Sequence, residues 1–364
     1  VATVLGSGPT KTSVELFNGV QVDLRVVADG SFGAALLYFT GSKEHNVALR
    51  QLALDRGWHL NEYGLVEGGE PGRDRRGGKL LAGQDEAEIY RALGLAYIEP
   101  ELREGTGEVE AAAAGRLPRL IKASDVRGDL HLHTTWSDGK QSLSEMMAAC
   151  TALGYDYMAV TDHSGSLVVQ GGLTEEKLAR QHQELVALTK DAEPGDISVL
   201  RGMEVDILKN GTLDLSDEWL ERLDIVLVSV HSYFELGRSD QTARVVKALS
   251  HSAVNVFAHP TGRLIGRRDP IELDFDKVFA ACAANGVAVE HNASPNRLDL
   301  SDVQLRAAVA AGLKVIINTD AHSTLGLATM PLGVSQARRA WLTTADVVNT
   351  WPLAEVRAFL DKSR

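Results

Sequence analysis

From Val126 to the end of the chain, short apolar runs alternate with amphipathic segments in a regular order. The apolar runs have the length of strands and the amphipathic segments have the period of helices, which is the pattern of parallel β/α units. The capping boxes Ser142-x-x-Glu145 and Ser301-x-x-Gln304 mark two of the expected helix starts. Seven strands are predicted, and they end at His131/His133, Thr161-Asp-His163, Met203-Glu204, Ser229-Val-His231, Ala258-His-Pro260, Glu290-His-Asn292 and Asn318-Thr-Asp-Ala-His322.

The beginning of the chain has another pattern, with short β-type runs up to about residue 40. Runs at 13–17 and 20–27 flank an Asn18-Gly19 turn, so we expect a β-hairpin. In its second strand Asp23 shares a face with Arg25, opposite an apolar face. This polar row is either a solvated face of the sheet or part of a site.

The middle of the chain contains a predicted helix at 85–94 and then a stretch rich in acidic residues, Ala, Gly and Pro between about 105 and 125. Such a composition marks a domain junction. We therefore expect a small α+β domain at 1–110, a linker at 111–125 and the β/α domain at 126–364. The Gly-rich loop at 66–80 is interpreted as a solvated tip, although its arginines could contact a nucleic-acid backbone: Arg73, Arg75 and Arg76.

Composition narrows the protein class. With 364 residues, 44% hydrophobic and 24% charged, the chain is long enough for a barrel and a smaller domain, and no apolar run is long enough to span a bilayer. Cys150 and Cys282 lie in Ala-rich predicted helices, so we expect no disulfide and a cytoplasmic location. The first residues show neither an initiating Met nor a signal pattern, so we expect the natural start to lie upstream. A net charge of -12 argues against non-specific nucleic-acid binding by the whole surface, while a local basic strip can still bind.

The candidate chemistry lies at the predicted strand ends. His131 and His133 alternate with Leu132 and so share a face, and Asp138 follows in a turn from which a carboxylate can reach back over the strand end. Clustering many imidazoles and carboxylates without cations would leave buried polar groups unpaired, so we predict a metal site. Its nine candidate ligands are His131, His133, Asp138, His163, Glu204, His231, His259, Asp320 and His322. This mixed set suits Mn²⁺, Zn²⁺ or Fe²⁺ better than Ca²⁺.

Other histidines are interpreted as ordinary core or capping residues: His45, His59, His182 and His251. His291 ends the sixth predicted strand, and whether it faces the site stays open.

The motifs that carry these ligands resemble the PHP family, which is named for polymerase and histidinol phosphatase. The resemblance covers about 126–345 and rests on Asp129-Leu-His-Leu-His-Thr-Thr-Trp-Ser-Asp-Gly139, Thr161-Asp-His-Ser164, Gly202-Met-Glu-Val-Asp206, Ser229-Val-His-Ser232, Ala258-His-Pro260 and Thr319-Asp-Ala-His322. It implies a seven-stranded variant of the β/α barrel with up to three ions, Mn²⁺ first. It also implies that His131, His133, Glu204 and Asp320 hold one ion, that Glu204 bridges to a second held by His231 and His259, and that Asp138, His163 and His322 hold the third. We take Glu204, His231, His259 and Asp320 as the catalytic members of this set.

Divalent ions lower the pKa of bound water from about 15.7 towards 7 and neutralise phosphate oxygens, so phosphoester hydrolysis is the expected chemistry. Arg263, Arg267 and Arg268 follow the fifth strand and are either phosphate contacts or a solvated loop paired with Asp269. Asn292 and Arg297 are weaker candidates, and Asn292 is alternatively a turn cap.

The first domain resembles the second half of the palm and the thumb of family X DNA polymerases, through Gly8-Pro-Thr-Lys11, Val22-Asp-Leu-Arg25, Tyr38-Phe-Thr-Gly-Ser42 and Asn61-Glu-Tyr63. The resemblance implies that Asp23 is the third carboxylate of a Mg²⁺ or Mn²⁺ polymerase site, with Arg25 near it. It also implies nucleotide-sugar contacts by Tyr38, Phe39 and Gly41, a nucleotide contact by Asn46 and a template contact by Arg50. Lys43 and His45 depart from the residue types common in that family, and the other two carboxylates belong to a strand upstream of Val1. Deoxynucleotides and polymerisation are therefore expected only if the palm is complete.

Together the two resemblances imply the C-terminal part of a bacterial-type family X polymerase, with Mn²⁺-dependent 3′ to 5′ exonuclease activity on DNA in repair and with 3′-phosphatase or abasic-site trimming as an extension. Two alternatives stay open. One is a small-molecule phosphatase of the histidinol-phosphate type. The other is a DNA-binding module whose metals only stabilise the fold.

Overall fold

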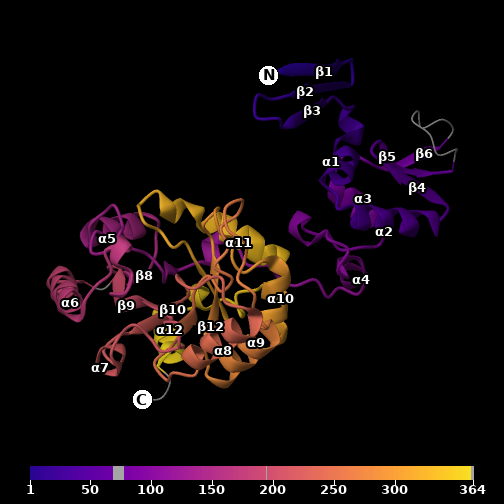
Figure 1. Ribbon diagram of the computed structural model, residues 1–364. Coiled ribbons are helices and arrows are strands. Elements are labelled where there is room, and N and C mark those ends of the chain that lie inside the picture. Colours follow the sequence, from indigo (N-terminus) through magenta and orange to yellow (C-terminus); the bar gives the residue numbers. More distant parts are fainter. Residues whose placement is uncertain (69–77, 194, 362–364) are drawn as a thin grey trace. The chain divides into compact units, whose positions relative to one another are not determined.

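The computed structural model describes residues 1–68, 78–193 and 195–361. It divides into two compact units, Val1–Leu117 (unit 1) and Pro118–Arg364 (unit 2) (Figure 1). The arginines of the Gly-rich loop, Arg73, Arg75 and Arg76, lie outside the described residues.

Unit 2 is built on a sheet of seven strands that are all parallel and follow one another in chain order. Beyond the first and last strands, Leu132 and Ala321 form a parallel bridge, and the His133 amide donates to the Ala321 carbonyl at 2.9 Å, so the barrel is nearly closed. The predicted fold class is therefore confirmed. The strands are β7 (Gly128–Asp129), β8 (Tyr157–Val160), β9 (Ser198–Asp206), β10 (Ile225–Ser229), β11 (Val256–Phe257), β12 (Ala288–Asn292) and β13 (Val315–Asn318).

Helices surround these strands, as Figure 1 shows. Both predicted capping boxes form, because Ser142 accepts from the Glu145 amide and Ser301 accepts from the Gln304 amide. Both cysteines are free and buried, in α5 and α9. The helices are α5 (Leu143–Ala152), α6 (Glu175–Thr189), α7 (Asp217–Leu220), α8 (Arg238–Leu249), α9 (Phe275–Ala284), α10 (Asp302–Ala310), α11 (Met330–Arg339) and α12 (Leu353–Leu360).

The strands are buried on both faces, which explains why they read as continuous apolar runs rather than as alternating ones. Leu200 and Leu227 belong to one core cluster, which also contains Leu360 of α12. Neighbouring residues such as Val226 point the other way, into the cluster formed with the outer helices. The Leu360 carbonyl accepts from the Asn255 side chain at 2.8 Å, so α12 covers the amino ends of the strands and leaves the carboxyl ends for the site.

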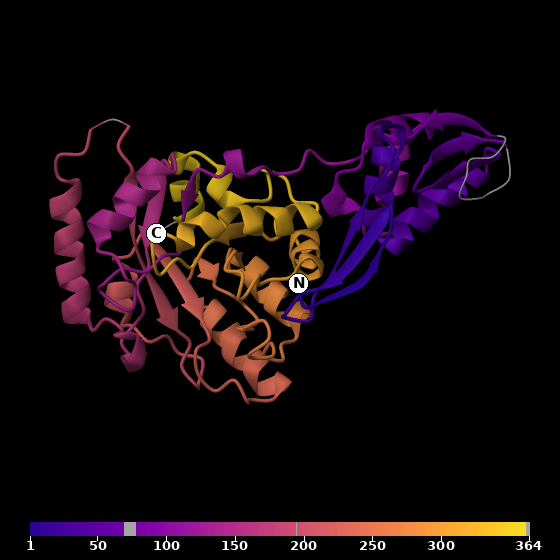
Figure 2. The ribbon, with the colours of Figure 1, turned by 90° about the horizontal axis from the view of Figure 1, so that it is seen from above.

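Unit 1 begins with the predicted hairpin, in which β2 (Lys11–Glu15) pairs antiparallel with β3 (Gln21–Arg25) and with β1 (Thr3–Ser7). Figure 2 shows these strands projecting from the helices of unit 1, and every residue of β1 and β3 is exposed. A second antiparallel sheet and four helices complete the unit: β4 (Trp58–Asn61), β5 (Gly64–Glu67), β6 (Lys79–Ala82), α1 (Phe32–Thr40), α2 (Lys43–Leu54), α3 (Glu86–Ala92) and α4 (Glu108–Ala113).

One expectation for unit 1 is wrong. The β-type reading up to about residue 40 fails at α1, a helix that buries Ala34, Ala35 and Leu37 against the rest of the unit. The helix expected at 85–94 is present as α3, with Asp85 as its N-cap. None of the described helices combines the length and the apolar character needed to cross a bilayer.

Candidate metal centre

Glu204 lies at the middle of a cluster at the carboxyl ends of the barrel strands. It projects from β9, and both neighbours in the strand, Met203 and Val205, point into the outer core. Its Oε1 accepts from Nε2 of His259 at 2.7 Å and lies 3.3 Å from Nε2 of His231. Its Oε2 lies 2.9 Å from His163 Nδ1, 3.4 Å from His131 Nε2 and 3.6 Å from His133 Nε2.

The other two candidate acids each contact histidines of the same cluster. Asp138 Oδ1 lies 3.3 Å from His322 Nε2 and 3.5 Å from His163 Nε2. Asp320 Oδ1 lies 3.1 Å from His133 Nε2 and 3.7 Å from His131 Nε2. The structure therefore brings all nine predicted side chains together.

Three groups of these side chains have ligand atoms within 4.8 Å of one another: His131, His133 and Glu204; His163, Glu204 and His231; and His133, Asp138, His163 and His322. The grouping differs in detail from the arrangement that the PHP resemblance implies. In the structure, His163 is grouped with Glu204 and His231, and His133 is grouped with Asp138. The distribution of ligands among ions stays a prediction.

The cluster contains buried atoms with lone pairs or protons that have no hydrogen-bond partner. Within the described residues these are His131 Nε2, His133 Nδ1, His163 Nδ1, Glu204 Oε2 and His259 Nδ1. His163 Nδ1 and Glu204 Oε2 are 2.9 Å apart, but their geometry is not that of a hydrogen bond. Each unsatisfied buried polar group costs about 1–3 kcal/mol. Divalent cations would accept these lone pairs, so the residues present fit a metal.

The electrostatics of the cluster point the same way. Burial alone would lower the pKa of His131, but the carboxylates of Glu290, Glu204 and Asp320 raise it well above its usual value. Burial and the neighbouring histidines lower the pKa of His133 to about 3. For His322, the Asp138 carboxylate outweighs burial and raises the pKa to about 9. In this cluster, carboxylates thus raise the pKa of some imidazoles, while burial and neighbouring imidazoles lower the pKa of others, and a bound divalent cation would displace the protons from its ligands.

Two of the nine candidates lie in the left-handed backbone region, His259 with φ 26° and Asp320 with φ 54°. Tyr233, two residues after His231, also has a positive φ of 57°. Non-glycine residues in this region are strained by roughly 1–3 kcal/mol, and such strain gathers at functional sites. The sharp turns at these strand ends aim the side chains across the barrel mouth.

Glu290 is a member of the site that the sequence reasoning missed. Its Oε1 accepts from His131 Nδ1 at 2.7 Å and from the Asn318 side-chain Nδ2 at 2.9 Å, and its Oε2 accepts from the His259 backbone N–H at 2.7 Å. By holding the Nδ1 proton of His131 it leaves Nε2 free to coordinate. His291 points the other way and Nδ1 lies 2.9 Å from the Leu300 carbonyl oxygen. The available signal was that Glu290 alternates with Asn292, a residue already named.

Two further buried carboxylates accept hydrogen bonds, mostly from candidate ligands or from residues that flank them. Asp206 accepts from the His231 backbone N–H at 3.0 Å. Asp162 accepts from Thr134, Ser137 and Gln181 side chains at 2.5–2.7 Å. These bonds orient the backbone around the candidate ligands.

The candidate phosphate contacts lie in two loops. Arg263 donates to the carbonyls of Arg297, at 2.7 Å, and Leu298. Arg268 donates twice to the Gly262 carbonyl, at 2.9 and 2.7 Å, whereas Arg267 is exposed.

Arg297 and Asn292 reach the cluster itself. Nε of Arg297 lies 3.4 Å from Asp320 Oδ2, and its Nη1 is buried with no hydrogen-bond partner among the described residues. The Asn292 side chain donates to Asp320 Oδ2 at 3.1 Å and also accepts from the Ser294 amide at 3.0 Å, so it caps its turn as well.

In unit 1, Asp23 lies on the exposed strand β3. Lys11 Nζ is 2.9 Å from its Oδ2, and Gln21 donates to its Oδ1 at 3.0 Å. Hydrogen bonds from Ser13, Lys11 and Gln21 hold the pKa of Asp23 well below its usual range. Among the described residues, Asp23 belongs to none of the groups of potential metal ligands.

Three of the five residues predicted to contact a nucleotide or template in unit 1 lie around one small cavity. Tyr38, Asn46 and Arg50 line it together. Asn46 donates to the Tyr38 carbonyl at 2.8 Å, and the Arg50 guanidinium lies 5.2 Å from the Tyr38 ring centroid. Phe39 is exposed under Arg25, with 4.6 Å between guanidinium and ring, and Gly41 ends α1 with φ 73°.

Four other histidines lie outside the cluster. His45 is buried between Glu108 and Tyr90, each at 2.8 Å. His182 contacts the Trp219 ring edge to face, and His251 lies 3.3 Å from Asp217. His59 lies in β4.

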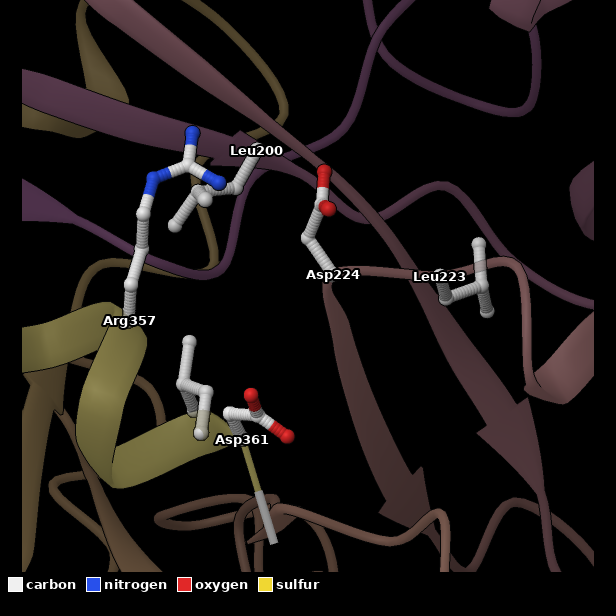
Figure 3. Close-up of a pocket in the computed structure, with 6 residues that line it drawn as sticks. Leu200, Leu223, Asp224, Arg357 and Asp361 are labelled. Carbon is white, nitrogen blue, oxygen red and sulfur yellow. The ribbon is translucent and has the colours of Figure 1, made fainter. Parts of the chain in front are cut away.

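A separate cavity opens at the opposite end of the barrel (Figure 3). Its lining comes from the amino-terminal part of β9, from the residues just before β10 and from α12 and the residue after it, and none of the nine candidate ligands takes part. The lining residues are Leu200, Leu223, Asp224, Arg357, Leu360 and Asp361.

A nearly closed seven-stranded β/α barrel with imidazoles and carboxylates at its mouth has the architecture of a metal-dependent phosphoesterase domain. Residues 129–294 match the PHP domain family, and residues 35–104 match the DNA polymerase beta thumb family.

The chain is 42% identical over 367 residues to the DNA polymerase/3'-5' exonuclease PolX of Bacillus subtilis, which covers all of this chain and 62% of that protein. It is 38% identical over 89 residues to DNA polymerase lambda of Rattus norvegicus, over 23% of this chain and 15% of that one. A "Probable phosphatase" of Syntrophotalea carbinolica is 26% identical over 231 residues, 61% of this chain and 90% of that one. The chain is thus similar along its whole length to this PolX protein and matches both the thumb and the PHP family models, and it spans less than two thirds of the length of that relative.

Proposed function

We propose that the chain is a metal-dependent phosphodiesterase, a 3′ to 5′ exonuclease that shortens DNA in repair. The observation that carries the proposal is the cluster of nine candidate ligands at the barrel mouth, with its buried, unpartnered nitrogen and oxygen atoms. The choice of DNA rests on the thumb match and on the name of the PolX relative.

The cluster has enough donors for up to three ions. In this proposal His131, His133, Glu204 and Asp320 hold one ion, Glu204, His231 and His259 a second, and Asp138, His163 and His322 a third. The mixed donor set favours Mn²⁺, with Zn²⁺ and Fe²⁺ as alternatives. When bound, such ions supply a hydroxide at neutral pH and neutralise charge on the phosphate.

The side chains of the chain itself orient the reaction. Glu204, His231, His259 and Asp320 surround the place where the phosphate would lie, and Glu290 fixes the tautomer of His131. Arg297 brings its unpartnered Nη1 to the same place, where a guanidinium can bind a phosphate oxygen.

DNA is the proposed partner of unit 1, through Tyr38, Asn46 and Arg50. Asp23 would bind Mg²⁺ or Mn²⁺, and deoxynucleotides would be used, only in a protein whose palm supplies further carboxylates, since a two-metal site needs several oxygens.

The test is the action of the purified chain, with Mn²⁺, on 5′-labelled single-stranded DNA and on a primer-template. A ladder of shortened products that disappears with a chelator is expected, while histidinol phosphate releases no phosphate. Phosphate release without DNA shortening would favour the small-molecule phosphatase. DNA binding without either reaction would favour a module with structural metals.

A further inference from the structure

Three aliphatic side chains in unit 2 are conspicuously exposed. Val168 is 81% exposed, Val169 95% and Leu325 84%, the largest fractions among the large hydrophobic residues described in this unit. The valines lie in a short 3₁₀ helix, Val168–Gln170, between β8 and α6. Leu325 lies between β13 and the 3₁₀ helix Gly326–Thr329. Both loops follow the carboxyl ends of strands, where the candidate metal centre lies.

Both loops also contact the part of the centre formed by Asp138, His163 and His322. The loop of the valines returns to His163, whose carbonyl accepts from the Leu173 amide at 2.8 Å. Gly171 packs against the turn of Asp138, because a Cβ there would lie 3.2 Å from the Ser137 carbonyl oxygen. On the other side, Leu325 comes three residues after His322, and the Thr324 amide donates to the Gln141 side chain at 3.2 Å.

The loop of the valines is held in a defined shape. The amides of Gln170 and Gly172 donate to the Leu167 carbonyl at 3.1 and 3.0 Å, and Leu167 itself is buried. The Ser166 amide donates to the Asp214 carboxylate at 2.6 Å. A Cβ at Gly172 would overlap the Ser164 carbonyl, so only glycine fits there. The two valines, stiff at χ1, are therefore presented outward at a fixed place.

The aliphatic character of these three side chains, called the tips below, limits what they can contact. The cluster beside them would take the phosphate, so the group next to that phosphate in a substrate would lie towards these loops. The face of a nucleobase is flat and apolar and can pack against aliphatic side chains by van der Waals contact, whereas a deoxyribose without a base offers no such face.

We propose that Val168, Val169 and Leu325 contact the nucleobase next to the scissile phosphate and thereby determine which 3′ nucleotides the centre prefers. The inference rests on the proposed exonuclease function and adds the residues that determine its preference. They would act by holding the base while the phosphodiester lies at the cluster, without touching the reacting atoms.

The test compares a V168S/V169S/L325S variant with the wild-type chain in the presence of Mn²⁺. The substrates are two single-stranded oligonucleotides that differ only in the 3′ nucleotide, which carries a base or is abasic. A V186S/V303S/L332S variant is the matched control, because these residues are also exposed but lie on α6, α10 and α11. Loss of a base contact should lower kcat/KM for the base-ended oligonucleotide about tenfold. Rates on the abasic end, and both rates of the control, should stay within about twofold of wild type.

An equal loss on both oligonucleotides would show that the tips only support the fold and would overturn the inference, as would no loss on the base-ended one. The V169S single variant changes the most exposed of the three and should show the same selective loss in smaller measure if the triple variant folds poorly. A wild-type chain that shortens neither oligonucleotide would instead refute the proposed function, and the inference with it.

Discussion

Replacing Glu290 with Gln tests whether a residue outside the predicted ligand set positions one of its members. Both carboxylate oxygens of Glu290 are acceptors, for His131 Nδ1 and the Asn318 side-chain Nδ2 on one side and for the His259 backbone N–H on the other. A glutamine has one carbonyl oxygen and one amide nitrogen. Whichever way it turns, at least one of these donors then faces an N–H group.

The expected size of the effect follows from that mismatch. Losing the partner of a metal-bound histidine typically costs 10- to 100-fold in metal affinity. Since each tenfold is about 1.4 kcal/mol, this is about 1.4–2.8 kcal/mol. A buried donor without an acceptor costs about 1–3 kcal/mol, which is the same range. We expect E290Q to bind Mn²⁺ about 10- to 100-fold more weakly and to recover part of its DNA shortening at high Mn²⁺.

The assay is competition for Mn²⁺ between the chain and a fluorescent chelator, followed by DNA shortening across a range of Mn²⁺ concentrations. Glu272→Gln is the matched control, because Glu272 is exposed just before α9. If E290Q bound Mn²⁺ as tightly as wild type, and E272Q did too, the proposed role of Glu290 in orienting His131 would be refuted.

Four further predictions concern single residues. Glu204→Gln should remove Mn²⁺ and DNA shortening together, since the Glu204 carboxylate lies within 3.6 Å of ring nitrogens of five histidines; full metal content with normal cleavage would contradict this. His163→Ala should abolish shortening but leave DNA affinity, measured by anisotropy, within a few-fold, because phosphate contacts elsewhere supply affinity; a parallel loss of both would make His163 structural. The pKa of His322 is raised to about 9, so its imidazole is protonated below that pH in the metal-free chain, and Mn²⁺ binding should release protons and strengthen as pH rises towards 9. Calorimetry at pH 7 in two buffers of different ionisation enthalpy measures this proton release. An absence of proton release would count against coordination by His322. Asp23→Ala should leave shortening unchanged, and primer extension should be absent from the chain as it stands; template-directed extension that Asp23→Ala abolishes would show a working palm.

Much of the barrel could be predicted from the sequence because its strands are buried on both faces and therefore read as compact apolar runs. Unit 1 was harder. In α1 the run Leu36-Leu37-Tyr38-Phe39 suits a strand or a helix locally, and the outcome depends on packing. The helix is settled by its neighbours, since at Gly33 a Cβ would overlap the backbone of Asp85 at the start of α3. Such a close approach of two segments that are distant in sequence leaves no local pattern.

At the candidate metal centre, too, the local sequence predicted some features, whereas others depend on tertiary packing. Strand ends rich in His and acids predicted where the nine side chains would gather, although their role as ligands stays a prediction. At the sixth strand the pattern could not say which of two neighbours faces inward, because both faces of the strand are buried. The structure turns Glu290 towards His131 and His291 towards the Leu300 carbonyl.

Arginines that the sequence predicts to contact phosphate can instead donate hydrogen bonds to backbone carbonyls in irregular loops. Buried carbonyls outside regular structure need donors. Arg263 supplies them to Arg297 and Leu298, which belong to the loop after β12. That bond fixes the loop from which Arg297 reaches Asp320. In the proposed function Arg263 would act on the substrate only indirectly, by holding the loop that carries Arg297, whose buried Nη1 has no hydrogen-bond partner among the described residues. A basic loop in a sequence predicts phosphate contacts, but which arginine makes them is decided by the carbonyls that the fold leaves without partners.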